Sequence, residues 1–154
     1  AEVEEVYYSK GSNYEYAPVG YVIKQEPASG SSIAEGSTVK IYVNKGFSAN
    51  ITVNLPSDLK LEQYYVSLWE DGVAVAESKM LDATQIIIYT FENVTSKRDS
   101  GTYTVKIRSA SSKALDYQVI TVDFKEGTAK RVGSYDDYKK LDADTSSSDN
   151  EDFN

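Results

Sequence analysis

The segment from Gly20 to Gly46 constrains the fold of this chain most strongly. It reads G-Y-V-I-K-Q-E-P-A-S-G-S-S-I-A-E-G-S-T-V-K-I-Y-V-N-K-G. Pro27 fixes its own φ and has no amide donor, which suits a turn or a strand boundary. Gly30 and Gly36 tolerate the positive φ of chain reversals. Residues 38–44 alternate between two faces, as a strand does, so this segment predicts short strands joined by tight turns.

These residues resemble the second half of a PASTA repeat, the small module of bacterial Ser/Thr kinases and penicillin-binding proteins. That family reads roughly G-x-V-[IV]-x-Q-x-P-x-x-G and then G-[ST]-x-V-x-[LI]-x-V-[SN]-K-G. The positions that match are Gly20, Val22, Ile23, Gln25, Pro27, Gly30, Gly36, Ser37, Val39, Ile41, Val43, Asn44, Lys45 and Gly46. With a further strand near residues 1–9, a turn at 10–13 and a connector at 14–19, we expect a three-stranded antiparallel sheet in residues 1–46.

A full PASTA repeat also has an initial strand and a helix that covers the sheet, and neither is visible before these strands. The sequence is then either a piece of a longer ectodomain or a degenerate repeat that rests on the next domain. Three strands with one uncovered apolar face are marginal alone. We therefore expect Val22, Val39, Ile41 or Val43 to be buried against the second domain or another copy of the chain.

The composition excludes several kinds of chemistry. The 154 residues include no Cys and no His, which removes thiol nucleophiles, His-based triads, and His or Cys zinc sites. A net charge of -8 argues against nucleic-acid binding and against docking on anionic lipid. No apolar run approaches the roughly 20 residues that span a bilayer, so we expect any membrane anchor to lie outside this chain.

Residues 47–132 read as six or seven short strands with the spacing of a β-sandwich. Asp71-Gly72 is a strong hairpin signal, because both residues tolerate positive φ. The strands are expected at 50–55, 63–70, 73–79, 85–91 (buried on both sides), 101–109, 117–125 and 128–132. Gly46-Phe47-Ser48-Ala49 is expected to be a short linker to the first domain.

The run D-S-G-T-Y-T-V at residues 99–105 resembles the D-x-G-x-Y-x-C motif of immunoglobulin-like domains. The resemblance implies that Tyr103 forms a tyrosine corner, with its hydroxyl bonded to upstream backbone, and that Val105 replaces the Cys. Trp69 lies on the opposite strand parity to Val66 and Leu68, so it does not fit the core Trp of that family. A fibronectin-III-like or other sandwich is the alternative.

From Gly133 the chain becomes acidic and Ser-rich, which predicts a disordered tail. An EF-hand loop counted from Asp142 fails, because Ser147 and Phe153 stand where Gly and the bidentate Glu belong. The expected organisation is a partial PASTA repeat at 1–46, an Ig-like sandwich at 47–132 and a disordered acidic tail at 133–154. The fold class is mainly β.

No motif brings two carboxylates across a cleft, and no Gly-rich loop precedes a helix, so we expect neither a catalytic site nor a cofactor or metal site. The N-x-T triplets at Asn50 and Asn93 have the form of N-glycosylation sequons. Both lie in or beside expected strands, where Asn and Thr are ordinary, so we expect them to have no such role. The family resemblance implies recognition of peptidoglycan fragments or β-lactam-like ligands. Aromatic, amide and charged groups near the Pro27 turn suit such ligands; these candidate binding residues are Tyr14, Tyr16, Tyr21, Lys24, Gln25, Glu26, Ser29 and Ser31. The competing interpretation is that Gln25 and Ser29 only satisfy turn backbone groups.

The order of modules resembles the extracellular end of a Gram-positive PASTA Ser/Thr kinase, which implies a cell-wall sensor that self-associates or extends to control the kinase. Two alternatives stay open. The first is the C-terminal region of a penicillin-binding protein, and the second is a structural or adhesive surface module that binds no ligand. In each case the chain is expected to be non-catalytic and to lie outside the cell membrane or in the cell wall.

Overall fold

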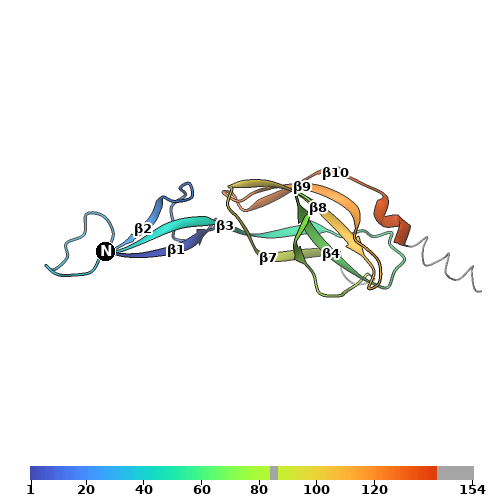
Figure 1. Ribbon diagram of the computed structural model, residues 1–154, viewed down its shortest axis with the longest axis horizontal. Coiled ribbons are helices and arrows are strands. Elements are labelled where there is room, and N and C mark those ends of the chain that lie inside the picture. The colour runs from blue at the N-terminus through green and yellow to red at the C-terminus, as the bar shows by residue number, and fades with distance from the viewer. Residues whose placement is uncertain (84–86, 142–154) are drawn as a thin grey trace, which may run out of the picture. The chain divides into compact units, whose positions relative to one another are not determined.

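The computed structural model describes residues 1–83 and 87–141 (Figure 1). The elements within these residues are ten strands and one 3-10 helix, so the mainly β fold is confirmed. The elements are β1 (Glu2–Tyr8), β2 (Val22–Glu26), β3 (Lys40–Asn54), β4 (Gln63–Glu70), β5 (Val73–Glu77), β6 (Leu81–Asp82), β7 (Ile88–Ser96), β8 (Ser100–Arg108), β9 (Leu115–Asp123), β10 (Thr128–Ser134) and η1 (Asp137–Lys139).

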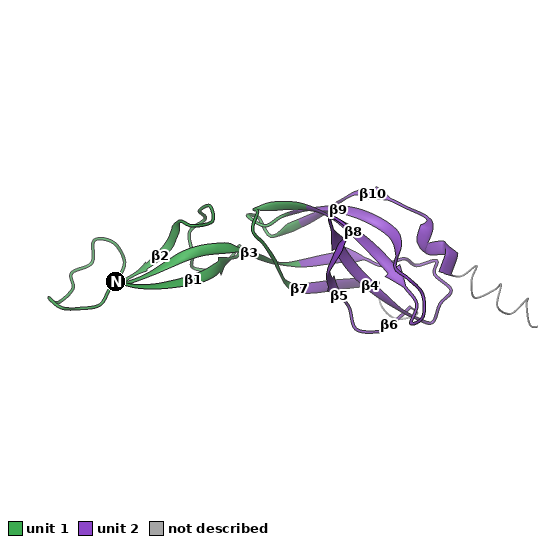
Figure 2. Ribbon diagram, viewed as in Figure 1, with its two compact units in different colours: residues 1–50, 93–101, 123–128 green, residues 51–92, 102–122, 129–154 purple. Residues whose placement is uncertain are grey.

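The chain forms two compact units that do not follow the order of the sequence (Figure 2). Unit 1 consists of residues 1–50, 93–101 and 123–128, and unit 2 of residues 51–92, 102–122 and 129–154. One sheet has the order β1-β3-β2, with β7 also paired to β3; the other has the order β10-β9-β8-β4-β5, with β6 also paired to β4. The segments 93–101 and 123–128 are therefore part of the N-terminal unit, although they are distant from it in sequence.

The N-terminal sheet is mixed, and the expectation of three antiparallel strands is wrong for one pairing. β2 is antiparallel to β3, but β1 is parallel to it, with Glu2 opposite Lys40 and Tyr8 opposite Phe47. The turn after β1 exists, since the Ser12 amide donates to the Ser9 carbonyl at 3.2 Å. It leads into a connector rather than into the next strand of a hairpin. A parallel pairing needs such a long crossover, which local turn signals do not reveal.

The sheet of unit 1 buries the face of β3 opposite to the one expected. Tyr42 and Asn44 are buried, whereas Val39, Ile41 and Val43 are half-buried and Val22 is 50% exposed. The connector covers the buried face, because the side-chain Nδ2 of Asn44 donates to the Ala17 carbonyl at 2.7 Å. Burial of the Val39-containing face against another copy of the chain stays a prediction.

The expected linker is a continuous part of β3. Phe47 and Ala49 are buried, and the Phe47 ring lies 6.0 Å from the rings of Tyr8 and Tyr16. Tyr16 donates a hydrogen bond to the Asp99 carboxylate, and Lys125 Nζ lies 4.5 Å from its ring centroid. This aromatic cluster therefore ties all three segments of unit 1 together.

Gly46 allows β3 to pass close to its neighbours in unit 1. A Cβ at this position would lie 2.7 Å from the Ser96 carbonyl oxygen and 3.0 Å from the Tyr7 ring, and φ is +156°. Gly46→Ala is expected to lower the free energy of unfolding by about 1–3 kcal/mol, because the backbone must shift to accept the methyl group. Urea unfolding followed by circular dichroism measures it. The control is Gly30→Ala, because Gly30 has positive φ but an added Cβ would have no neighbour within 4 Å. If both variants lost the same free energy of unfolding, the clash at Gly46 would not be the cause.

Unit 2 alternates buried and outward residues along its strands, as its sequence predicts. Tyr64, Val66 and Leu68 of β4 are fully buried, and Trp69 lies outward, as expected. Asp71 and Gly72 have φ values of 51° and 78°, which confirms the hairpin between β4 and β5.

Two details of the expected sandwich are not found. Tyr103 is buried, but the described structure gives its hydroxyl no hydrogen bond to upstream backbone, so the tyrosine-corner bond is absent. The strand expected at 85–91 begins at Ile88, and Ile87 and Ile88 are exposed. The expected burial on both sides is therefore wrong for these two residues, although the run is uniformly apolar. Residues 85 and 86 lie outside the described residues.

The chain does not become disordered at Gly133. β10 continues to Ser134, η1 follows, and Tyr138 and Leu141 are buried. Tyr138 lies edge-on to Tyr117, with ring centroids 4.9 Å apart, and its hydroxyl donates to Asp58 Oδ1 at 3.0 Å. The sequence did not predict the burial of Tyr138 and Leu141, because charged residues surround both of them. The rest of the expected tail, residues 142–154, lies outside the described residues.

Candidate functional site

A surface pocket of about 410 Å³ in unit 1 contains three of the expected binding residues, Lys24, Gln25 and Ser29. The other residues that line it are Asn13, Glu15, Val22, Ile23 and Ala28. The pocket lies between β2, the turn that follows it and the connector after β1. It combines an apolar strip with amide, hydroxyl and charged groups, as ligand pockets commonly do.

Lys24 is the central charged group of this region. Its Nζ lies 5.9 Å from the Tyr14 ring centroid and 5.4 Å from that of Tyr42, and 3.0 Å from Glu26 Oε1. The Tyr42 hydroxyl donates to Glu26 Oε2 at 2.9 Å. The hydrogen bond from Lys24, followed by that from Tyr42, lowers the pKa of Glu26, and the same Lys24–Glu26 bond raises the pKa of Lys24. Both groups therefore stay ionised at neutral pH.

The turn residues have mainly local roles. The peptide bond between Glu26 and Pro27 is cis. Gln25 Nε2 donates to the Pro27 carbonyl at 3.2 Å, and the Ser31 amide donates to the Ala28 carbonyl at 3.1 Å. For Gln25, the interpretation as a residue that satisfies turn backbone is thus supported, although Gln25 also lines the pocket. Ser31 is exposed and is not among the residues that line the pocket.

Two of the expected tyrosines lie elsewhere. Tyr16 belongs to the aromatic cluster with Tyr8 and Phe47, and its hydrogen bond to Asp99 is the main reason that its pKa is raised. Tyr21 is 63% exposed, and its carbonyl accepts a hydrogen bond from the Asn44 amide. These tyrosines are near Tyr14 in sequence, but the Tyr14 ring packs against Tyr42 instead.

The sequence did not identify three residues that surround Lys24, namely Tyr42, Lys40 and Glu4. Tyr42 lies opposite Lys24 and Glu4, and Lys40 lies opposite Glu26 and Glu2 in the sheet register. Lys40 Nζ is 2.9 Å from Glu4 Oε2 and 5.1 Å from the Tyr42 ring centroid. The alternation of β3 placed Lys40 and Tyr42 on one face, but only the strand order shows that Lys24, Glu26 and Glu4 share that face.

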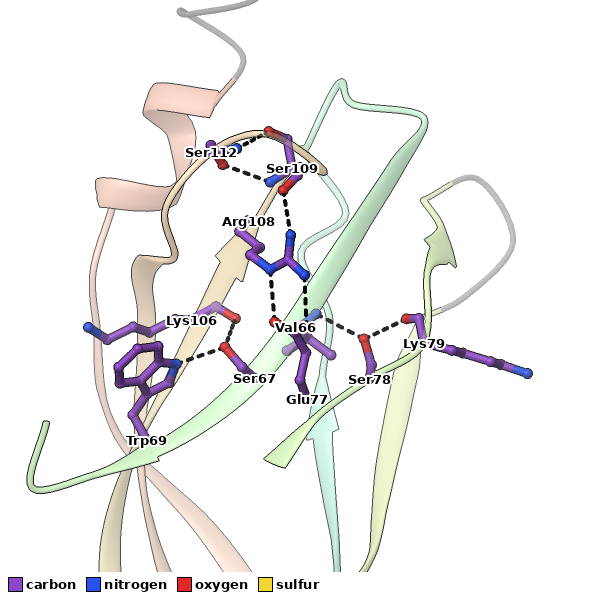
Figure 3. A network of polar contacts seen from close by, with 10 residues as sticks. All are labelled: Val66, Ser67, Trp69, Glu77, Ser78, Lys79, Lys106, Arg108, Ser109 and Ser112. Atoms are coloured by element: carbon purple, nitrogen blue, oxygen red, sulfur yellow. Dashed lines mark hydrogen bonds and ion pairs between the residues drawn. The ribbon is translucent and has the colours of Figure 1, made fainter. Parts of the chain in front are cut away.

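Unit 2 contains another polar cluster, on the outward face of β4, β5 and β8 (Figure 3). Arg108 Nε and Nη2 donate to the two Glu77 carboxylate oxygens, both at 2.8 Å. Trp69 Nε1 donates to Ser67 Oγ at 2.8 Å, and Lys106 Nζ lies 4.5 Å from the Trp69 ring centroid. These groups face and satisfy one another. We interpret the cluster as stabilising the sheet.

The Glu77–Arg108 pair predicts a pH dependence of stability. The hydrogen bond from Arg108 lowers the pKa of Glu77 in the folded state. The stabilisation is therefore present above the unfolded pKa and is lost as the pH falls through the lower, folded pKa. Because the Glu77 side chain is 40% exposed, solvent screening limits the effect to at most about 1 kcal/mol. Urea unfolding of Glu77→Gln and of the exposed control Glu92→Gln, from neutral pH to about pH 3, measures it. The free energy of unfolding should fall less steeply with decreasing pH in Glu77→Gln than in the unaltered chain, and Glu92→Gln should not change this slope.

Other classes of site are not found among the described residues. No group of three or more Asp and Glu side chains is placed to hold a metal ion in residues 1–83 and 87–141. None of the helices in that same part of the chain is long and apolar enough to cross a membrane. The described geometry is that of a β-protein with a polar and apolar surface pocket in unit 1.

The comparisons with known proteins support the PASTA resemblance of the N-terminal segment. Residues 1–45 match the PASTA domain family. PASTA is a non-catalytic binding domain, typically extracellular, that binds peptidoglycan or β-lactam-like ligands. No curated protein and no solved structure matches the chain. The match ends within β3, so Phe47 of the aromatic cluster lies beyond the matched residues.

Proposed function

We propose that this chain recognises peptidoglycan fragments through the pocket beside Lys24, as the extracellular sensor region of a membrane Ser/Thr kinase. The observation that carries the proposal is the position of Lys24, whose ammonium group lies over the neighbouring Tyr14 and Tyr42 rings and beside a pocket. This pocket lies in the segment that matches the PASTA domain family.

The chemistry of the pocket suits such a ligand. A peptidoglycan fragment offers carboxylates, amides and sugar rings. Lys24 can donate to a carboxylate, while Asn13, Gln25 and Ser29 offer amide and hydroxyl groups. Val22 and Ala28, which are both exposed, provide the apolar surface against which a sugar or methyl group packs. Glu26 already pairs with Lys24, so an incoming carboxylate competes with it, which favours weak and reversible binding.

The parent protein and the second domain are also proposals. Burial of Val105 and Tyr103 on one face of β8 supports an Ig-like domain within residues 47–132. A penicillin-binding protein remains the alternative parent, and upstream sequence distinguishes it from a kinase. The other alternative, a structural or adhesive module that binds no ligand, is favoured by one observation, the local bond between Gln25 and the Pro27 carbonyl.

A lysine variant tests the proposal. Lys24→Met keeps most of the side-chain volume and removes the charge, and Lys113→Met is the control, because Lys113 is exposed in unit 2. We expect Lys24→Met to weaken binding to soluble peptidoglycan fragments by about tenfold, the effect of losing one charge-assisted hydrogen bond. Titration calorimetry measures it. Equal binding by both variants would assign the interaction to another surface.

A further inference from the structure

A second pocket in unit 1, of about 330 Å³, is lined mainly by polar side chains. Four separate segments contribute to it: Lys10 from the turn after β1, Ser48 and Asn50 from β3, Asn93 from β7, and Glu126 from the turn between β9 and β10. All of these segments belong to unit 1 (Figure 2). The pocket shares no lining residue with the one beside Lys24.

Hydrogen bonds and close packing fix the walls of this pocket. Asn50 Oδ1 accepts a bond from the Asn93 amide at 3.0 Å, and Asn93 has a φ of 53°. The Glu126 amide donates to Asp123 Oδ1 at 3.0 Å. Gly127 lies so near Lys10 that a Cβ on it would be 3.3 Å from the Lys10 Cβ. Walls held in this way reduce the conformational cost of binding a ligand.

Lys10 and Glu126 form a loose ion pair at the rim. Lys10 Nζ lies 3.5 Å from Glu126 Oε2, and their side chains are 58% and 53% exposed. Exposed pairs contribute little stability, so opening this one costs little. A ligand that carries one positive and one negative group can replace both ends of the pair and leave neither charge unpartnered. The adjoining amide and hydroxyl groups of Asn93 and Ser48 suit a peptide group.

We propose that this pocket binds a zwitterionic amino acid or short peptide. The carboxylate of the ligand pairs with Lys10, and its ammonium group pairs with Glu126. Asn93 and Ser48 contact the amide of a dipeptide. The site is separate from the pocket beside Lys24, so it stands or fails independently of the proposed function.

Nuclear magnetic resonance of the ¹⁵N-labelled chain, titrated with L-alanyl-L-alanine, tests this proposal. We expect saturable shifts, with millimolar affinity, at the amides of Ser48, Asn50, Asn93 and Gly127. The same dipeptide with an acetylated N-terminus and an amidated C-terminus has no charges and is expected to shift none of them. Absence of shifts at millimolar dipeptide, or equal shifts with the capped form, would overturn the proposal. Shifts confined to Asn13, Lys24 and Ser29 would overturn it and leave the proposed function standing.

Charge-removing variants sharpen the test. Lys10→Gln and Glu126→Gln are each expected to weaken dipeptide binding by about fivefold, because one end of the ligand loses its partner. Lys130→Gln, on the exposed part of β10 in unit 2, is expected to bind like the unaltered chain. The amide resonances of Tyr42 and Asn44, which are buried in unit 1 and do not line this pocket, report whether the Lys10 and Glu126 variants keep their fold. Unchanged affinity in both charge variants would refute the assignment.

Discussion

Phe47→Ala is expected to lower the free energy of unfolding by about 3–5 kcal/mol, the usual cost of removing a buried aromatic ring. Phe47 is 2% exposed, and its ring contacts those of Tyr8 and Tyr16. It lies on β3, after the residues that match the PASTA domain family. No α-helix covers the sheet in the part of the chain that the structure describes. The aromatic cluster is therefore a main source of packing for unit 1.

Two matched variants check that the loss comes from the cavity. Phe47→Leu keeps an apolar side chain and is expected to cost less than about 1.5 kcal/mol. Tyr21→Ala removes a ring that is 63% exposed and is expected to change stability by no more than about 0.5 kcal/mol. Urea unfolding followed by far-ultraviolet circular dichroism compares the three. If Phe47→Ala lost less free energy of unfolding than Phe47→Leu, the aromatic cluster would not be what stabilises unit 1.

Tyr138→Ala is expected to cost about 3 kcal/mol of unfolding free energy, although the residue lies in a segment whose composition indicates disorder. Its ring is 6% exposed and packs on Tyr117, and its hydroxyl bonds to Asp58. The same unfolding experiment measures the loss.

Tyr138→Phe separates the ring from the hydroxyl group. It is expected to cost about 1 kcal/mol, the contribution of one hydrogen bond. Burial and the bond to Asp58 raise the pKa of Tyr138, so the hydroxyl remains a donor at neutral pH. If Tyr138→Ala had no effect, residues 135–141 would not be an anchored part of unit 2.

Local patterns predicted the elements of this fold well. The period-2 alternation of β4 placed Tyr64, Val66 and Leu68 inside and Trp69 outside, and Asp71-Gly72 located the hairpin. Each of these depends on a few consecutive residues, whose side chains alternate by geometry alone. Lys24 was a candidate because it lies near the Pro27 turn in the sequence, and the structure places it beside a pocket.

What the sequence did not predict depends on long-range pairing. The parallel partner of β3 is 38 positions away, since Glu2 lies opposite Lys40. The Tyr42 face is buried because the connector crosses it, and Asn44 is bonded to Ala17. Asp99 and Lys125 contact Tyr16 from segments about 80 residues or more downstream. Turn chemistry and strand periodicity contain no information on such contacts.

The same limit explains the partial result for the candidate site. Tyr42, Lys40 and Glu4 surround Lys24 and Glu26 through strand register. Grouping residues by sequence distance instead selected Tyr16 and Tyr21, which lie elsewhere. A correct strand order, combined with the parity of β3, would have selected Tyr42 and Lys40.

The most direct test of ligand recognition is a titration of the ¹⁵N-labelled chain with a soluble uncrosslinked muropeptide, followed by nuclear magnetic resonance. The account predicts saturable shifts centred on Asn13, Lys24, Gln25 and Ser29, which line the pocket beside Lys24, and their loss in Lys24→Met. It would be contradicted if millimolar muropeptide shifted none of these amides, or if the shifts lay only in unit 2.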